Sequence, residues 1–316
     1  AYIDIGEKTQ LTLGFRDYEQ DMKLLASNGY YGDKQYGLIG GNFTSSASGT
    51  IPKINLKHNI NDDFMVYGSY TEGFRPGGVN RMSPSDTAPR TYEADYLESM
   101  ELGFKSKLAD GKLTMNGALY SMDWTDYQTT TFDINLVSIA FVDNVGNAEV
   151  TGIELSLDYA INDTTSLTYY FNGVDSTLAN DYYQEGALYA SSGNRLAYIP
   201  EISAYVSLDK DFNLMGRSGY MNLDYSYTGD RAEDYADGAI ILPSYGLANF
   251  RTGIDFDNTS IELYVNNIFD KDGFLSIYDD FAELAPPERT SGYPGFGYRR
   301  TGSKPRVIGI RFRYRY

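Results

Sequence analysis

The sequence predicts an all-β chain, folded as a transmembrane antiparallel β-barrel, and three observations support this prediction. Apolar and polar residues alternate over segments of about 9–12 residues, which is typical of strands with one apolar and one polar face. Short turns and long polar loops alternate between these segments, so every long loop falls at the same end of the expected sheet. The chain also closes on a strand with an aromatic end, and all three features are typical of bacterial outer-membrane barrels.

The C-terminal segment shows the alternation most clearly. From residue 308 onward one parity is wholly apolar or aromatic, and the opposite parity carries three arginines. The apolar parity consists of Ile308, Ile310, Phe312, Tyr314 and Tyr316. A soluble sandwich would also bury this face and leave the arginines in water, so the strand alone does not decide. The aromatic pair at its end favours a membrane strand, because aromatic residues bound the lipid-facing band of such barrels.

Composition agrees with a strand-built membrane protein. The chain of 316 residues has 30 tyrosines and 16 phenylalanines, yet its mean hydropathy is −0.40. Alternating strands explain this combination because their two faces average out, and no apolar run is long enough for a transmembrane helix. The lack of cysteine excludes a disulfide framework and thiolate metal sites. A net charge of −17 argues against nucleic acid as a partner, since phosphates require a basic surface.

The alternation predicts about thirteen strands, the first of them represented only by its end. The expected strands are at residues 2–5, 10–18, 51–58, 63–73, 100–105, 112–126, 153–159, 167–172, 202–208, 221–227, 248–256, 261–265 and 308–316. Long loops are expected at residues 19–49, 74–95, 127–147, 176–198 and 270–304. Within the strand at 112–126 the apolar residues change parity after Met115, which predicts a β-bulge near Gly117.

Parity also predicts which side chains face lipid and which face the lumen. The residues expected to face lipid are Ile308, Ile310, Phe312, Leu263, Val265, Phe250, Ile254, Leu155 and Leu157. Those expected to face the lumen are Arg311, Arg313, Arg251, Glu262, Glu154 and Lys105. The charged group belongs inside because a charge on the lipid face near the bilayer midplane costs about 2–4 kcal/mol.

The sequence contains only weak signals for a catalytic or metal site. The only histidine, His58, stands beside Asn59 with no serine nearby in sequence, so a solvated histidine is the better interpretation than a general base. Asp270-Lys271-Asp272-Gly273 lacks the ligand set and terminal glutamate of an EF-hand, and a turn is expected there. The glycines between Gly292 and Gly297 lack the strand–turn–helix setting of a phosphate loop. We therefore expect no catalytic, metal or cofactor site, although an outer-membrane enzyme remains an alternative.

The long loops are rich in tyrosine and arginine, which offer rigid contact area and bidentate hydrogen bonds to anionic ligands. Loops on a rigid scaffold are also where binding residues usually lie. The expected ligand-binding residues are Arg75, Arg81, Arg90, Tyr182, Tyr183, Arg195, Tyr235, Tyr278, Tyr293 and Phe296. The alternative is that these side chains hold the loops together or contact lipopolysaccharide.

Several stretches resemble one family. Residues 70–78 read Tyr-Thr-Glu-Gly-Phe-Arg-Pro-Gly-Gly, and residues 145–154 read Val-Gly-Asn-Ala-Glu-Val-Thr-Gly-Ile-Glu. Residues 265–271 read Val-Asn-Asn-Ile-Phe-Asp-Lys, and Pro305-Arg306 opens the final aromatic strand. In order and spacing these stretches resemble the TonB-dependent outer-membrane receptors, of the type that takes up iron complexes and siderophores.

The resemblance implies a 22-stranded barrel closed by an N-terminal plug. Such a receptor imports a scarce nutrient, most often a ferric siderophore, with energy from the TonB-ExbB-ExbD complex. Residues 1–316 would then be the C-terminal portion of one barrel domain, without the plug and the early strands. Its surroundings would be lipid and lipopolysaccharide of the bacterial outer membrane. A passive porin is the second alternative.

Closure of the complete barrel gives one more expectation. An unpaired strand edge is costly in lipid, so the last strand of the family's barrel pairs with the first. With the early strands missing, we expect residues 2–5 and 307–316 each to lack a backbone partner on one side.

Overall fold

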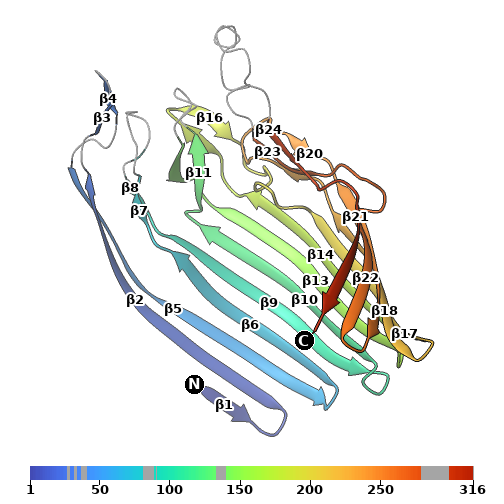
Figure 1. Cartoon of the computed structure of the whole chain (residues 1–316). Coiled ribbons are helices and arrows are strands. Elements are labelled where there is room, and N and C mark those ends of the chain that lie inside the picture. The colour runs from blue at the N-terminus through green and yellow to red at the C-terminus, as the bar shows by residue number, and fades with distance from the viewer. Residues whose placement is uncertain are drawn as a thin grey trace.

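The computed structural model describes residues 1–26, 29–31, 34–36, 41–80, 89, 91–132, 140–278 and 299–315. These residues form one curved wall of strands with small hairpins gathered at one end (Figure 1). The wall is a single 13-stranded antiparallel sheet whose neighbouring strands follow the order of the chain. Within the described residues, no helix is long and apolar enough to cross a membrane. The predicted all-β class and the single sheet are confirmed.

The wall strands are long and nearly continuous. They are β1 (Tyr2–Ile5), β2 (Thr9–Ala26), β5 (Gly41–Asn61), β6 (Phe64–Arg75), β9 (Asp95–Leu108), β10 (Leu113–Thr125), β13 (Ala148–Asn162), β14 (Thr165–Leu178), β17 (Ile202–Leu214), β18 (Arg217–Thr228), β21 (Tyr245–Phe256), β22 (Thr259–Asn266) and β25 (Val307–Tyr314). Tight turns join them in pairs at one end of the wall, which we call the turn end. At the turn of residues 109–112, Ala109, Asp110 and Gly111 adopt left-handed backbone with φ of 52°, 54° and 81°.

At the opposite end, the long connections carry two-stranded hairpins, and we call it the hairpin end (Figure 1). The hairpins are β3 (Gly29–Tyr31) with β4 (Lys34–Tyr36), β7 (Gly78–Val79) with β8 (Thr91–Tyr92), β11 (Gln128–Phe132) with β12 (Ala140–Asn144), β15 (Tyr182–Gln184) with β16 (Ala187–Ala190), β19 (Arg231–Ala232) with β20 (Ile241–Leu242), and β23 (Phe274–Tyr278) with β24 (Arg299–Gly302). The alternation of short and long connections is therefore confirmed, whereas the hairpins within the long connections were not predicted.

The strand register separates two faces of the wall. Leu263 pairs with Ile310 on one face, and Glu262 pairs with Arg311 on the other. Because directly opposed residues point to the same side of a sheet, the pairing can be followed from strand to strand. All nine residues predicted to face lipid lie on one side, the apolar face. All six charged residues of the predicted lumen set lie on the other side, the polar face. That the polar face lines a lumen stays a prediction.

The prediction of a loop at residues 19–49 is wrong for most of that range. Strand β2 continues to Ala26 and pairs with β5 from Gly41 onward, without a break in the ladder. The sequence in this part does not alternate, because Leu24 and Leu25 are adjacent and residues 44–49 are small or polar on both parities, and this Ser/Thr content mimics a loop. Backbone hydrogen bonding does not need alternation, and a strand that is wet on both sides can still pair.

The bulge expected near Gly117 is also absent. The register of β10 runs without a shift from Leu113, opposite Tyr159, to Trp124, opposite Ala148. Tyr120 and Trp124 therefore lie on the polar face, and they do so near the hairpin end. They pack there against a buried cluster of loop residues, which explains an apolar side chain on the polar parity without a change of register.

The two edges of the sheet agree with the expectation from closure. In the part of the chain that the structure describes, β1 pairs only with β2 and β25 pairs only with β22. The two edge strands do not pair with each other, so the wall is open.

Glycines on the polar face make room for tyrosines. A Cβ atom added to Gly103 would lie 2.5 Å from the ring of Tyr67, the residue directly opposite on β6. A Cβ atom on Gly309 would lie 2.4 Å from the ring of Tyr264 on β22. Each ring lies flat across the neighbouring strand, and glycine is required because any side chain there would collide with it.

Candidate functional site

The candidate site lies where the polar face meets the hairpin end, and Asp95 is its centre. Asp95 is fully buried at the start of β9. Its carboxylate accepts hydrogen bonds from the Nε of Arg75 (2.9 Å), the indole Nε1 of Trp124 (2.9 Å) and the backbone N–H of Gln128 (3.0 Å). Hydrogen bonds from charged and neutral donors to a buried carboxylate are strong, so they hold the donor residues in fixed positions. It ties β6, β10 and β11 to β9.

Arg75 presents the exposed part of this network. Its Nη2 also donates to the backbone oxygen of Gln128 at 2.6 Å, and its guanidinium lies 4.7 Å from the centre of the Trp124 ring. The ring of Tyr127 is 5.6 Å away, and burial raises the pKa of its phenol. The Arg75 side chain is nevertheless 47% exposed. A held but accessible guanidinium next to two aromatic rings can bind an anionic or aromatic ligand group with little ordering cost.

A buried core fills the space between the hairpins. Its residues come from three connections and the adjoining ends of β13 and β14. Its tyrosine cluster, Tyr182, Tyr189 and Tyr235, has ring centres 5.7–6.3 Å apart. Tyr182 donates to Asp143 on β12 at 2.6 Å. Packed around the three rings are Val145, Ala148, Val150, Leu178, Ala190 and Leu196. This core joins hairpins β11–β12 and β15–β16 with the segment between β19 and β20.

Burial sets the electrostatics of the tyrosine cluster. It raises the pKa of Tyr189 to about 12, and it raises the pKa values of Tyr182 and Tyr235 further. The pKa of Asp234, beside this cluster, is also raised by burial. All three phenols are therefore neutral near pH 7. The hydroxyl of Tyr235 is buried and has no hydrogen-bond partner among the described residues.

Two further arginines brace the hairpin end. Arg195 donates from Nη1 to the carboxylate of Asp230 at 2.8 Å and lowers its pKa. Arg231 is almost fully buried, and its Nη2 bonds the backbone oxygens of Phe274 and Leu275. Both side chains cross from one connection to the next, so they hold the hairpins against each other.

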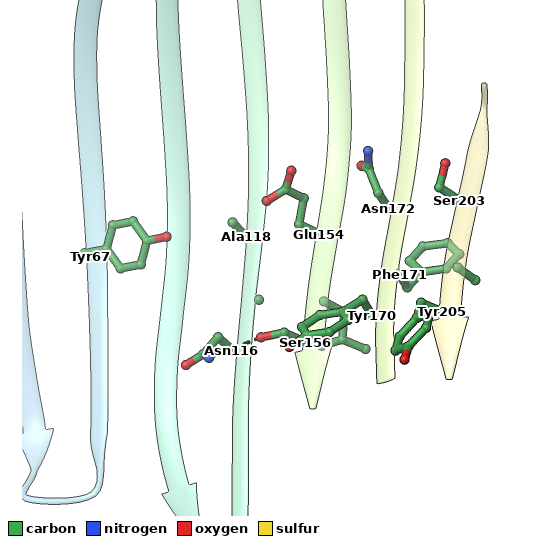
Figure 2. Close-up of a pocket in the computed structure, with 13 residues that line it drawn as sticks. Tyr67, Asn116, Ala118, Glu154, Ser156, Tyr170, Phe171, Asn172, Ser203 and Tyr205 are labelled. Carbon is green, nitrogen blue, oxygen red and sulfur yellow. Dashed lines mark hydrogen bonds between the residues drawn. The ribbon is translucent and has the colours of Figure 1, made fainter. Parts of the chain in front are cut away.

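Below the hairpins, the polar face carries an aromatic hollow of about 390 Å³ (Figure 2). Tyr67, Asn116, Glu154, Asn172, Tyr170 and Tyr205 line it and come from five strands. The rings of Tyr170 and Tyr205 are 6.1 Å apart and nearly parallel. Tyr67 donates its hydroxyl to Glu101, which fixes that carboxylate against the wall. The hollow therefore offers ring faces, amides and one carboxylate to a polar ligand.

The predicted ligand-binding residues fall into three groups. Arg75, Tyr182, Arg195 and Tyr235 are brought together at the hairpin end, where each is engaged by other protein groups. Tyr183 is 55% exposed on β15. The remaining predictions lie outside the described residues: Arg81, Arg90, Tyr293, Phe296 and the side chain of Tyr278.

Two of the predicted lumen residues form an ion pair on the polar face. Arg311 donates to Glu262 at 2.7 Å, and Arg251 and Arg313 share the same side of the sheet. His58 hydrogen-bonds the hydroxyl of Thr9 at 2.8 Å, near the turn end.

Asp95, Trp124 and Gln128 were missed from the sequence. A single aspartate at the start of a strand carries no signal that it will be buried. The one available hint was the tryptophan on the polar parity, which we attributed to a bulge. Apolar residues on the wrong parity at the loop end of a strand are better interpreted as contacts with folded loops.

Comparison with known proteins adds the family. The family described as "TonB dependent receptor-like, beta-barrel" matches residues 1–268. A curated relative, the pesticin receptor of Yersinia pestis, is 23% identical over 249 residues, which cover 78% of this chain and 35% of that protein. The chain thus spans about a third of the length of the curated relatives it matches.

Solved structures share the fold. The ferric yersiniabactin uptake receptor FyuA of Yersinia pestis superposes with a TM-score of 0.78 at 18% identity, covering 98% of this chain and 43% of that one. The siderophore receptor PiuA of Acinetobacter baumannii gives 0.72 at 17% identity, with 100% and 42% covered. A copper transporter, OprC, gives 0.71 at 14% identity, with 99% and 46% covered. With the family matched over most of its length, this chain belongs to the TonB-dependent receptors of the Gram-negative outer membrane and forms part of their β-barrel.

Proposed function

We propose that the whole protein is an active-transport receptor that binds a ferric siderophore and imports it with energy from the TonB-ExbB-ExbD complex. Family membership and the siderophore receptors among its structural neighbours support this proposal. The observation that carries it is the platform of Arg75, Trp124 and Tyr127, held by buried Asp95 at the mouth of the polar face. A porin has no need for such a fixed cationic and aromatic group at its mouth.

In this proposal residues 1–316 are one portion of a single barrel domain. The polar face, with Arg251, Glu262, Arg311 and Arg313, lines the lumen. The apolar face meets lipid, and lipopolysaccharide surrounds the hairpin end. Such an arrangement satisfies the requirement that charged side chains avoid the hydrocarbon.

The residues that contact ligand divide by their exposure. Arg75 and Tyr183 are accessible and would contact it directly. Tyr182, Arg195 and Tyr235 would hold the hairpins in the binding arrangement. Arg81, Arg90, Tyr278, Tyr293 and Phe296 belong to the same proposed ligand-binding set.

The test replaces Arg75 by lysine in the full-length receptor. Lysine keeps the charge opposite Asp95 but loses the planar fork, so ligand affinity should fall about tenfold or more. Growth on ferric chelates as sole iron source and equilibrium binding to purified receptor measure the effect. Arg217→Lys is the matched control, since Arg217 pairs with Asp257 at the turn end.

A passive porin would behave differently. It would pass diverse small sugars in liposome-swelling assays, and uptake would not depend on TonB. Sugar permeation at porin rates, or chelate uptake that persists without TonB, would contradict the proposal.

A further inference from the structure

We propose that the transported ligand is anionic and that Lys53, Lys57 and Lys105 form a cationic track for it along the polar face. This inference rests on the proposed transport function and adds the charge of the ligand and part of its path. The track runs from the middle of β5 toward the turn end of β9.

The three lysines line one hollow of about 480 Å³ on the polar face, next to the aromatic hollow of Figure 2. Tyr67 is shared by both hollows. The rest of the lysine-lined hollow is largely uncharged, with Thr12, Asn55, Ser69 and Thr71 between the lysines. A volume of several hundred Å³ is typical of sites for small ligands.

Strand pairing gives the spacing of the track. Lys57 lies opposite Tyr67, which lies opposite Gly103, and Lys105 is two residues farther along β9. With about 3.3 Å per residue and about 4.8 Å between strands, Lys57 is about 13 Å from Lys53 and about 12 Å from Lys105, measured between Cα atoms. A lysine side chain reaches about 6 Å on a flexible stem, so an anion about 10 Å across can contact two successive ammonium groups at once.

Within the part of the chain that the structure describes, the ammonium groups of the track are unpaired. Throughout the described ranges, no hydrogen bond or ion pair engages the side chains of Lys53, Lys57 or Lys105, whereas Lys8 and Lys210 each bond protein oxygens. Glu101, the carboxylate in the same hollow, is held by the hydroxyl of Tyr67.

On the other half of the polar face, side-chain hydrogen bonds engage carboxylates. Arg311 bonds Glu262, Asn222 bonds Asp209, and Asn249 bonds Asp224. In a chain of net charge −17, three lysines that line one hollow form a local concentration of positive charge. Since the Debye length is about 8 Å at physiological salt, each lysine acts mainly on a ligand in its own neighbourhood, which favours stepwise contact over long-range attraction.

The main test uses the full-length receptor with Lys53→Gln, Lys57→Gln and Lys105→Gln combined. Its probes are two synthetic chelates of different charge, a trianionic ferric tris-catecholate and an uncharged ferric tris-hydroxamate. Binding to de-energised cells reports the outer site, and energised uptake reports passage. We expect uptake of the trianion to fall at least tenfold with binding unchanged, and uptake of the uncharged chelate to be unaffected. Lys112→Gln, in the turn of residues 109–112, is the control for loss of a positive charge.

Several outcomes would overturn the inference. Equal loss for both chelates would mean that the lysines shape the pore, and no loss for either would mean that they have no role in passage. Faster proteolysis of the plug in the lysine variant, with uptake of the two chelates changed alike, would mean that the lysines hold an acidic protein segment. If the unmodified receptor took up neither chelate in energised cells, the proposed transport function would be contradicted instead.

A second measurement needs no transport. Pyridoxal phosphate, an anionic aldehyde, should label Lys57 and Lys105 of the purified full-length receptor faster than Lys112 after borohydride reduction, and the trianionic chelate should protect them. If Lys57, Lys105 and Lys112 were labelled at the same rate and the chelate protected none of them, an anion site on this strip would be excluded.

Discussion

The wall and the hairpin end of this chain are built by opposite means. Leu263 and Ile310, on the apolar face of the wall, are 40% and 62% exposed, whereas Leu178 and Leu242 at the hairpin end are 1% and 0% exposed. The wall is held by its backbone ladder and leaves its apolar side chains for lipid. The hairpin end has a core, buried carboxylates and cross-connecting arginines, as a water-soluble domain has. One chain thus follows two sets of packing rules, and the same substitution should have different costs in the two regions.

The largest difference should come from removing a leucine. Leu178→Ala should destabilise the hairpin end by about 2–5 kcal/mol, because it leaves a cavity in a closed core. Leu263→Ala should cost less, since lipid chains can fill the space. Segment-resolved hydrogen exchange of the full-length receptor in bilayers measures both. We expect faster exchange at residues 126–147, 179–201 and 229–244 in the first variant only. Equal effects would mean that the wall has a packed core as well.

Adding a charge to the apolar face should destabilise the wall, where removing a leucine costs little. Ile310→Arg places a guanidinium on the apolar face and should cost about 2–4 kcal/mol near mid-membrane. Arg313→Ile, three positions along the same strand but on the polar face, should change stability little. Urea unfolding in lipid vesicles compares the two variants. A tolerated arginine at position 310 would show that this face is not in contact with hydrocarbon.

The two regions also differ in how well the sequence predicts them. The wall follows from alternation, because lipid on one side and water on the other impose a period of two on every strand. Even Ile254 and Ile310, on strands far apart in sequence, could be assigned to the same face from parity alone.

The hairpin end could not be predicted in this way. Its core joins Val145 and Tyr235, from two separate connections, with Leu178 at the end of β14, and no local period relates them. Both faces of a strand that leaves the membrane are free to meet water or another loop, so the extension of β2 to Ala26 and the contacts of Trp124 carried no alternating signal. Among the candidate residues, tyrosine and arginine content pointed to the long connections, but it did not distinguish exposed Tyr183 from buried Tyr235.

Alkaline pH should destabilise the hairpin end more than the wall. Burial raises the pKa of Tyr189 from 10 to about 12, and those of Tyr182 and Tyr235 are raised too. The folded hairpin end then binds more protons than the unfolded one at high pH. Its stability is retained below pH 10 and is lost as the pH rises through about 12. Hydrogen exchange corrected for its own pH dependence should show the hairpins opening before the wall. Simultaneous opening would contradict a separate core.

The smallest effect should distinguish two tyrosines within the hairpin core. Tyr182 donates a hydrogen bond to Asp143, whereas the buried hydroxyl of Tyr235 has no partner in the described ranges. Tyr182→Phe should therefore cost about 1.5–3 kcal/mol at most, the range for hydrogen bonds to charged groups. Tyr235→Phe should be neutral or slightly stabilising, because it removes an unsatisfied polar group and keeps the ring. Hydrogen exchange at residues 179–201 and 229–244 measures both changes. If Tyr235→Phe proved as costly as Tyr182→Phe, its hydroxyl must bind a group that bridges the hairpins, and the core would be partly polar.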